Sequence, residues 1–383
     1  MHKKLENMLR RRFLQESVSF DMSNYMTIEP LSDGFSFRCV NTNVEYTTDG
    51  KKWTKLSANT NSETFSSGQF ISVRSKLQPG EYFGRFLLRG TQCNLRGNCL
   101  SLIFGDYAKG KLDISQYSDV FYQTFYGGSN IISVEKNFLP ALILGDYCYA
   151  EMFRECLNLT SALDLPATTL AIGCYNAMFQ RCIKLTTAQN ILPAMNLMNN
   201  CYAQMFINCT SLTTAPVLPA TALTSYTCYS QMFAGCSKLS YLEIHATTYF
   251  DTSLTIMQML TNAGTSATSK IIYMHDRGNP SVISTLNTSW TISDIKIAPS
   301  YITINTNSSI EAPYLCDMNS GGSSMSWGNW IMDTKYNPGH FYLDDDGCVN
   351  STILGKLYIG TTPVGADLIF LISGAYNTEY VIA

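Results

Sequence analysis

The chain has 383 residues, of which 45% are apolar and 14% charged, and its formal net charge is -3. A chain of this length is expected to form about two to four domains, and its weak negative charge excludes a general attraction to nucleic acid or anionic lipid. The abundance of tyrosine (23) and phenylalanine (19) is typical of a β-rich protein.

Residues 1–17 predict an amphipathic helix that serves in docking or oligomerisation. Four apolar side chains share one helical stripe: Leu5, Met8, Leu9 and Phe13. The other interpretation is a helix packed on its own chain, and the short stripe disfavours a membrane-surface helix. No uninterrupted apolar region and no small-residue cleavage site follow, so a Sec signal peptide is not expected.

Residues 18–117 predict a small β-sandwich-like domain. Strand patterns occur at residues 35–40, 44–46, 70–73 and 83–88. Asp49 and Gly50 mark a hairpin turn shortly before Trp53. Short strands that alternate with frequent turns favour two small packed sheets.

Residues 118–297 contain an internal repeat with the pattern Cys-Tyr-x-x-Met-Phe-x-x-Cys-x-x-Leu. The four full units begin at Cys148, Cys174, Cys201 and Cys228, which are 26, 27 and 27 residues apart. A Leu-Pro pair separates the units. Weaker copies at residues 120–131 and 254–274 flank them, as expected for the ends of a repeat array.

The spacing within one unit predicts its local structure. Buried residues at i, i+4, i+5 and i+8 indicate one or two helical turns, and a short β-prone segment follows until proline ends it. One unit cannot enclose its own apolar face, so the units are expected to stack into a curved solenoid with a parallel sheet and short helices. The eight in-phase cysteines are expected to be reduced and buried as small apolar side chains.

This pattern closely resembles the BspA-like leucine-rich repeats of Bacteroides-type bacteria and their phages and prophages. The resemblance covers about residues 118–297 and implies a binding scaffold without chemistry of its own. The surroundings of Tyr46, Asp49 and Trp53 and residues 97–106 resemble the N-terminal module that often precedes this repeat in phage- or prophage-encoded proteins. The expected fold class is mixed and β-rich, with a leucine-rich-repeat solenoid between N- and C-terminal β-domains.

A pair of polar residues follows the repeat leucine of each unit. These pairs are Thr160, Ser161, Thr186, Thr187, Thr213, Thr214, Ser240 and Tyr241. On a parallel sheet they are expected to stack into polar columns. They form either a soluble, charge-poor face or a hydroxyl-rich surface for a protein or glycan. The column of repeat tyrosines is expected to be mostly buried.

Residues 298–383 predict a C-terminal β-module, with a buried strand near residues 366–373, that acts as a receptor-binding tip or as a plain cap. No residue is assigned to catalysis, a cofactor or a metal. The four histidines lack metal or nucleophile spacing, and the repeat cysteines lie eight apart instead of in a Cys-x-x-Cys motif. Residues 344–347 are interpreted as a solvated turn, not a calcium loop.

The sequence favours two functions of different classes. The first is a non-enzymatic phage virion protein of the head, fibre or tail, made in the host cytoplasm, with attachment to the host surface as a second role. The alternative is a bacterial cell-surface adhesin for host protein or glycan, and the missing export signal favours the virion protein. Expected partners are other virion proteins, copies of itself and a host surface glycan or protein, without nucleic acid or membrane insertion.

Overall fold

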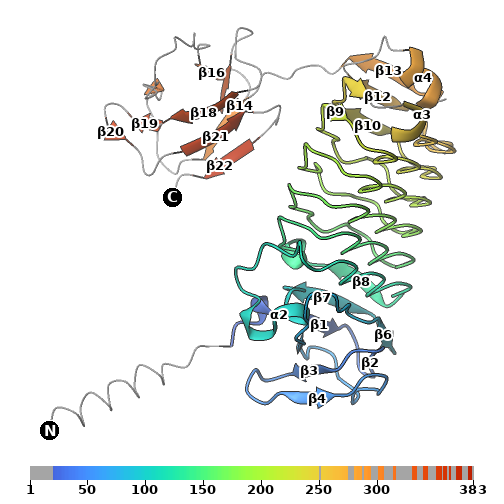
Figure 1. The fold of residues 1–383 in the computed structure, drawn as a ribbon, viewed down its shortest axis with the longest axis vertical. Helices are drawn as coiled ribbons and strands as arrows, with labels where there is room; N and C mark the ends of the chain where they lie inside the picture. Colours follow the sequence, from blue (N-terminus) through green and yellow to red (C-terminus); the bar gives the residue numbers. More distant parts are fainter. Residues whose placement is uncertain are drawn as a thin grey trace. The chain divides into compact units, whose positions relative to one another are not determined.

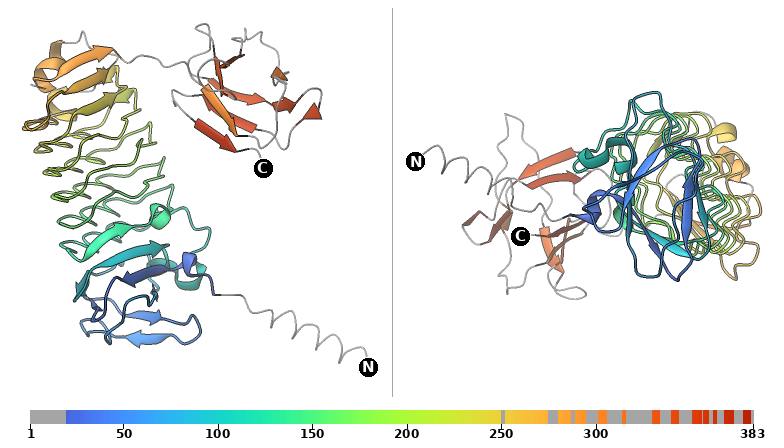
Figure 2. Two further views of the ribbon diagram at one scale, coloured as in Figure 1. Left: turned by 180° about the vertical axis from the view of Figure 1, so that it is seen from behind. Right: turned by 90° about the horizontal axis from the view of Figure 1, so that it is seen from below.

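The computed structural model describes residues 20–249, 252–274, 280–286 and 289–294, together with the strands of the C-terminal part. The chain divides into two compact units, Met1–Ile295 and Lys296–Ala383. In the first unit a β-domain is followed by a stack of coils (Figures 1 and 2). The predicted docking helix, with its stripe of Leu5, Met8, Leu9 and Phe13, lies outside the described residues.

The β-domain is built on a six-stranded mixed sheet. Its strand order is β4 (Thr54–Leu56), β3 (Val44–Thr47), β5 (Ile71–Arg74), β1 (Met26–Pro30), β7 (Cys93–Gly97) and β8 (Ile131–Val134). Neighbouring strands are antiparallel except β7 and β8, which run parallel. In the predicted hairpin between β3 and β4, Gly50 has a φ of +69°, a left-handed conformation that favours glycine.

A second sheet pairs β2 (Ser36–Cys39) with β6 (Phe86–Arg89) in antiparallel fashion. The ring of Phe37 in β2 lies 5.7 Å from Tyr46, 6.1 Å from Phe65 and 5.9 Å from Phe86. Because Tyr46 belongs to the large sheet, these aromatic contacts join the two sheets through one core. Short helical turns complete the domain: η1 (Met22–Asn24), α2 (Ser101–Phe104), η2 (Gly105–Tyr107) and η3 (Lys136–Phe138).

The β-domain continues directly into the first coil. Strand β8 belongs to its sheet although it lies beyond residue 117, where the sequence analysis ended the domain. The backbone N–H groups of Phe83 and Phe86 donate to the carbonyls of Val120 and Thr124, both at 2.7 Å. The rings of Phe86 and Phe125 stack with centroids 5.3 Å apart. The domain therefore covers the end of the coils with hydrogen bonds and apolar surface.

Successive repeats lie one upon the next and are joined by backbone hydrogen bonds. Tyr149 donates to the carbonyl of Cys174 at 3.0 Å, and Tyr175 donates to the carbonyl of Cys201 at 3.0 Å. We call the coils from Val120 to Met274 the repeat stack. Within it, corresponding residues of neighbouring repeats lie side by side.

The segment predicted to be helical is instead a series of turns. In the coil that begins at Tyr147, φ is +50° at Tyr147, +53° at Glu151 and +60° at Glu155. Ala150, Met152 and Arg154 donate N–H bonds to the carbonyls three residues before them, whereas Glu151 and Phe153 donate to the next coil. The helix prediction was wrong because a spacing of four also fits consecutive turns with a left-handed residue at every fourth position.

Two columns of nearly parallel rings fill the interior of the repeat stack. The first contains Phe121, Tyr149, Tyr175, Tyr202 and Tyr229, with neighbouring centroids 5.7–6.0 Å apart. The second contains Phe125, Phe153, Phe179, Phe206 and Phe233, at 5.4–5.9 Å. All these rings are buried, which confirms the expectation for the repeat tyrosines. Each ring covers the next one, so a single coil could not bury its own apolar face.

The eight repeat cysteines are free and buried, as predicted. The first column is Cys148, Cys174, Cys201 and Cys228. The second column is Cys156, Cys182, Cys209 and Cys236. Each thiol of the second column donates to a phenylalanine carbonyl of the preceding coil at 3.0–3.3 Å. The second column therefore also links neighbouring coils, a role that the sequence analysis did not foresee.

Among the described residues of the repeats, a regular parallel sheet forms only toward the C-terminal end. It consists of β10 (Tyr241–Ile244), β12 (Ile271–Met274) and β13 (Thr291–Asp294), and β12 confirms the strand predicted at residues 271–274. A shorter parallel pair joins β9 (Ala222–Leu223) to β11 (Thr248–Tyr249). Earlier repeats contribute isolated parallel bridges. Short helices occur in the last coils as α3 (Thr252–Thr255) and α4 (Pro280–Leu286).

The second unit contains only strands among its described residues. A four-stranded sheet has the order β16 (Trp330–Asp333), β17 (His340–Leu343), β14 (Tyr301–Asn305) and β22 (Thr378–Val381). The smaller sheets are formed by β15 (Tyr314–Leu315), β19 (Leu357–Ile359) and β20 (Thr362–Pro363), and by β18 (Ser351–Gly355) and β21 (Leu368–Ile372). Strand β21 lies where a strand was predicted, and the turn at residues 344–347 lies outside the described residues. The chain as described is β-rich with few helices.

Candidate binding face of the repeat stack

The polar pairs predicted from the sequence form two adjacent columns on the repeat stack. Parallel bridges join Ser161 to Thr187, Thr187 to Thr214 and Thr214 to Tyr241. In the neighbouring column, backbone N–H groups donate to the carbonyl of the corresponding residue one coil earlier. We call the eight residues together the hydroxyl face: Thr160, Ser161, Thr186, Thr187, Thr213, Thr214, Ser240 and Tyr241.

The repeat leucine before each pair explains why the hydroxyl face reaches solvent. Leu159, Leu185, Leu212 and Leu239 are fully buried. The side chain directly after each leucine points away from the core, because successive side chains of an extended chain point to opposite faces, and no residue of the four pairs is buried. Five of the eight residues are exposed and the other three are half-buried.

The two columns of the hydroxyl face differ in how their hydroxyl groups are used. In the first column, Thr160 donates to the carbonyl of Ile132 at 3.3 Å, and Thr186 donates to that of Thr160 at 3.1 Å. The hydroxyls of Thr187 and Thr214 in the second column make no hydrogen bond to the described residues and are exposed. The first column therefore stabilises the contact between coils, while the second offers donors and acceptors to a partner.

Aromatic and acidic side chains continue the second column at its C-terminal end. The Tyr241 hydroxyl donates to Glu243 Oε2 at 2.6 Å, and His245 Nε2 lies 2.6 Å from Glu243 Oε1. The Tyr241 and Tyr273 rings are 5.6 Å apart. The sequence analysis missed Glu243 and Tyr273, although the alternating burial of β10 and β12 places both on the same side as Tyr241.

The electrostatics of this end favour hydrogen bonding over charge recognition. Burial and the adjacent carboxylate of Glu243 raise the pKa of Tyr241 well above its ordinary value, so its hydroxyl remains protonated at neutral pH. The hydroxyl face itself carries no formal charge. Among the residues that the structure describes, no group of three or more His, Cys, Asp or Glu side chains could hold a metal ion. The arrangement can bind through hydroxyl and aromatic contacts.

Comparison of the chain with protein-family models, with curated proteins and with solved structures finds no match. Within the described ranges, no helix is both long enough and apolar enough to cross a membrane. The second group of predicted site residues lies outside the described residues: Leu5, Met8, Leu9 and Phe13.

Proposed function

We propose that the chain is a non-enzymatic binding scaffold, a BspA-like leucine-rich-repeat solenoid whose hydroxyl face recognises a protein or glycan. The observation that carries this proposal is the row of Thr187 and Thr214, whose exposed hydroxyls make no hydrogen bond to the described residues, in line with Tyr241. Hydroxyl groups both donate and accept hydrogen bonds, and a tyrosine ring adds apolar contact area. Such a surface suits a polar partner of low charge.

The solenoid part of the proposal is supported by the way in which the coils are held together. Backbone hydrogen bonds and ring stacking connect each coil to its neighbours through residues 25 to 28 positions apart. Repeat proteins are stabilised in this nearest-neighbour manner. The fully buried leucine of each unit agrees with the repeat pattern that the sequence resembles.

We assign this scaffold to a phage virion, as a structural or accessory component of the head, fibre or tail that also attaches to the host surface. The support is the resemblance of the repeats and of the preceding module to phage-encoded proteins. Other virion proteins, or copies of the chain, are the proposed partners of the stripe Leu5, Met8, Leu9 and Phe13. The alternative is an adhesin of the bacterial cell surface, for which the same face would bind host protein or glycan.

The binding role is tested by removing two hydroxyls with little change in shape. We expect the double substitution Thr187→Val and Thr214→Val to weaken binding to host cells or to arrayed surface glycans by about tenfold or more. The matched control is Thr210→Val with Thr224→Val, since both residues are exposed and lie outside the hydroxyl face. Equal binding by the two double variants would contradict a role for the face.

The virion assignment has a separate test. Mass spectrometry of purified particles is expected to detect the chain, and its absence from particles contradicts the assignment. Deletion of residues 1–16 is expected to lower the copy number in particles, because the short apolar stripe requires a partner surface. Normal incorporation of the truncated chain would show that this segment does not attach the protein to the particle.

A further inference from the structure

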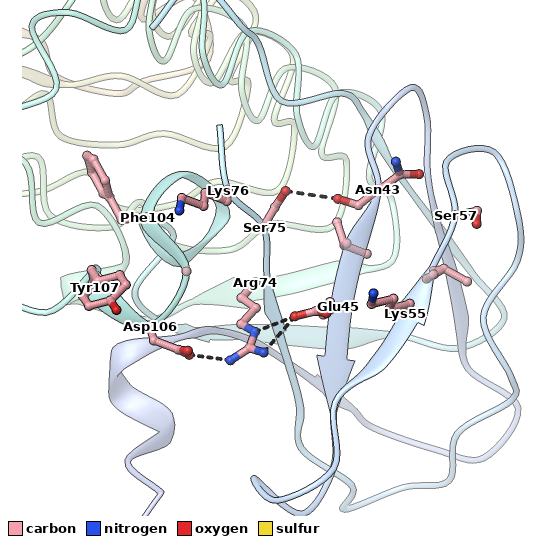
Figure 3. A pocket seen from close by; sticks show the side chains of 13 residues that line it. Asn43, Glu45, Lys55, Ser57, Arg74, Ser75, Lys76, Phe104, Asp106 and Tyr107 are labelled. Carbon is pink, nitrogen blue, oxygen red and sulfur yellow. Dashed lines mark hydrogen bonds and ion pairs between the residues drawn. The ribbon is translucent and has the colours of Figure 1, made fainter. Parts of the chain in front are cut away.

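The β-domain contains a pocket of about 570 Å³ that includes no residue of the hydroxyl face (Figure 3). Its lining comes from the edge formed by β3 and β4, from the end of β5, and from the turn η2. The side chains that matter for its chemistry are Glu45, Lys55, Arg74, Lys76, Asp106 and Tyr107. Its volume lies within the range of about 300–1,000 Å³ that is usual for small-ligand sites.

Arg74 lies between the two acidic side chains of the pocket and binds both of them (Figure 3). Its Nε and Nη2 atoms donate to Glu45 Oε2 at 2.9 and 2.8 Å, and its Nη1 atom donates to Asp106 Oδ1 at 2.6 Å. The guanidinium carbon also lies 3.8 Å from the centre of the Trp53 ring. Burial opposes the charge of Arg74, but the bonds to Glu45 and Asp106 raise its pKa above the ordinary value. The guanidinium therefore holds two carboxylates in place.

In each of these two carboxylates, Arg74 binds only one oxygen atom, and the other oxygen can accept a further hydrogen bond. Tyr25 donates to Asp106 Oδ1 at 2.8 Å, the same oxygen that Arg74 binds. Oε1 of Glu45 and Oδ2 of Asp106 have no hydrogen-bond partner among the described residues, and the two side chains are 34% and 53% exposed. Two fixed acceptors therefore remain on the pocket surface, where hydroxyl groups of a ligand could donate to them.

The rest of the lining adds positive charge and an aromatic surface. Lys55 and Lys76 are exposed, and neither has an ion-pair partner among the described residues. The lining thus carries three cationic side chains against two carboxylates. Tyr107 is 76% exposed, although an aromatic ring is usually covered. Its exposed face offers an apolar contact next to polar groups.

We propose that this pocket binds an acidic saccharide, that is, a sugar unit with a carboxylate group. The sugar carboxylate pairs with Lys55, sugar hydroxyls donate to Glu45 and Asp106, and the C–H face of the saccharide lies against Tyr107. The excess of cations favours an anionic ligand. The two carboxylates would repel a compact anion such as phosphate. In an acidic sugar the carboxylate and the hydroxyl groups are separate, so the charge can lie near a lysine while neutral hydroxyls face Glu45 and Asp106.

The proposal is tested with the full chain and glycan probes of defined charge. Oligosaccharides that end in glucuronate or sialate are titrated calorimetrically, next to the same oligosaccharides without the acidic unit. We expect binding of the acidic probes only. Tyr107→Ala and Lys55→Gln are each expected to weaken it by about tenfold. The matched controls are Tyr82→Ala and Lys52→Gln, because both residues are exposed and lie outside the pocket, and we expect them to leave affinity unchanged.

Three outcomes would overturn the saccharide proposal. They are the absence of binding to any acidic probe, equal binding of neutral and acidic probes, and affinity in the Tyr107→Ala and Lys55→Gln variants equal to that of the controls. Circular dichroism of each variant checks that the fold is intact. The result is independent of the hydroxyl face, since the Thr187→Val and Thr214→Val variant is expected to bind the acidic probes normally.

Discussion

At the scale of single residues, the tyrosines of the buried column differ in how their two parts are accommodated: the rings stack on one another, but the hydroxyl groups lack hydrogen-bond partners. The hydroxyl groups of Tyr175, Tyr202 and Tyr229 are buried and have no hydrogen-bond partner among the described residues. A buried polar group without a partner costs about 1–3 kcal/mol. The stacked rings, at 5.7–6.0 Å, must therefore stabilise this column against the cost of its hydroxyls.

This imbalance predicts the effect of removing one hydroxyl. We expect Tyr202→Phe to leave the free energy of unfolding unchanged or to raise it by up to about 1 kcal/mol, since the ring stays and the unpaired group is removed. The control is Tyr46→Phe, which removes a hydroxyl that donates to Glu63 at 3.1 Å and should lower stability. Denaturant unfolding measures both, and an equal loss would reveal a partner for the Tyr202 hydroxyl.

The two cysteine columns provide a second contrast between residues that look equivalent in the sequence. Cys209 donates to the carbonyl of Phe179 at 3.0 Å, whereas the buried thiol of Cys201 donates to no carbonyl of the described residues. Serine shortens the side chain and replaces a weakly polar thiol by a hydroxyl that requires a partner.

Serine substitution is therefore expected to separate the columns. We predict that Cys201→Ser lowers the free energy of unfolding by about 1–2 kcal/mol more than Cys209→Ser, because only position 209 keeps an acceptor. Alanine at each position is the control for lost volume, and chemical denaturation is the measurement. A smaller loss for Cys201→Ser than for Cys209→Ser would mean that the S–H···O contact has no energetic role.

At the scale of one element, each coil depends on the rings above and below it. Phe206 is buried, and its ring lies 5.6 Å from that of Phe179 and 5.6 Å from that of Phe233. The coil contains few regular helix or strand hydrogen bonds of its own, because many of its N–H groups bond to the next coil. Ring packing and bonds between coils therefore replace a helix or sheet within the unit.

Loss of one ring should destabilise the coils on both sides. We expect Phe206→Ala to lower the free energy of unfolding by about 3–5 kcal/mol, through the cavity and the two lost ring contacts. Phe206→Leu retains most of the volume and should cost clearly less. Thermal and denaturant unfolding, with hydrogen exchange at the neighbouring coils, measure the loss. A cost below about 1 kcal/mol for alanine would contradict a continuous packed column.

At the scale of the whole molecule, the buried thiols make stability depend on pH. Burial raises the pKa of Cys156, Cys174, Cys228 and Cys236 to about 12, from an ordinary value of 9.0. Burial also raises the pKa of the other four repeat cysteines well above that value. Above about pH 9 the unfolded chain releases thiol protons that the folded chain still holds, which favours unfolding.

The stability that the protonated thiols contribute is fully present below about pH 9 and is lost as the pH rises toward 12, by about 1.4 kcal/mol per pH unit for each thiol. Urea unfolding in a reducing buffer at about pH 8 and about pH 10.5 measures the loss. Replacement of Cys174 by alanine should make the slope shallower. An unchanged slope would mean that this thiol ionises equally in both states.

The sequence by itself determined the period, phase and buried side chains of the repeat stack. The in-phase cysteines, the repeat tyrosines and the Met-Phe pairs were predicted to be buried, because apolar groups that recur at a fixed spacing must share one interior. The eight residues of the hydroxyl face were placed together for the same reason. Parallel stacking of equal units makes such columns a direct consequence of the period.

Only the tertiary structure decided how the backbone of each coil is folded and where the chemistry lies. A spacing of four fits both a helix and consecutive turns, and the hydrogen bonds between coils selected the turns. The pocket could not be predicted, because Glu45, Arg74 and Asp106 are about 30 residues apart from one to the next and carry no motif. They meet because strand pairing places β3 beside β5, and the turn η2 then brings Asp106 to Arg74.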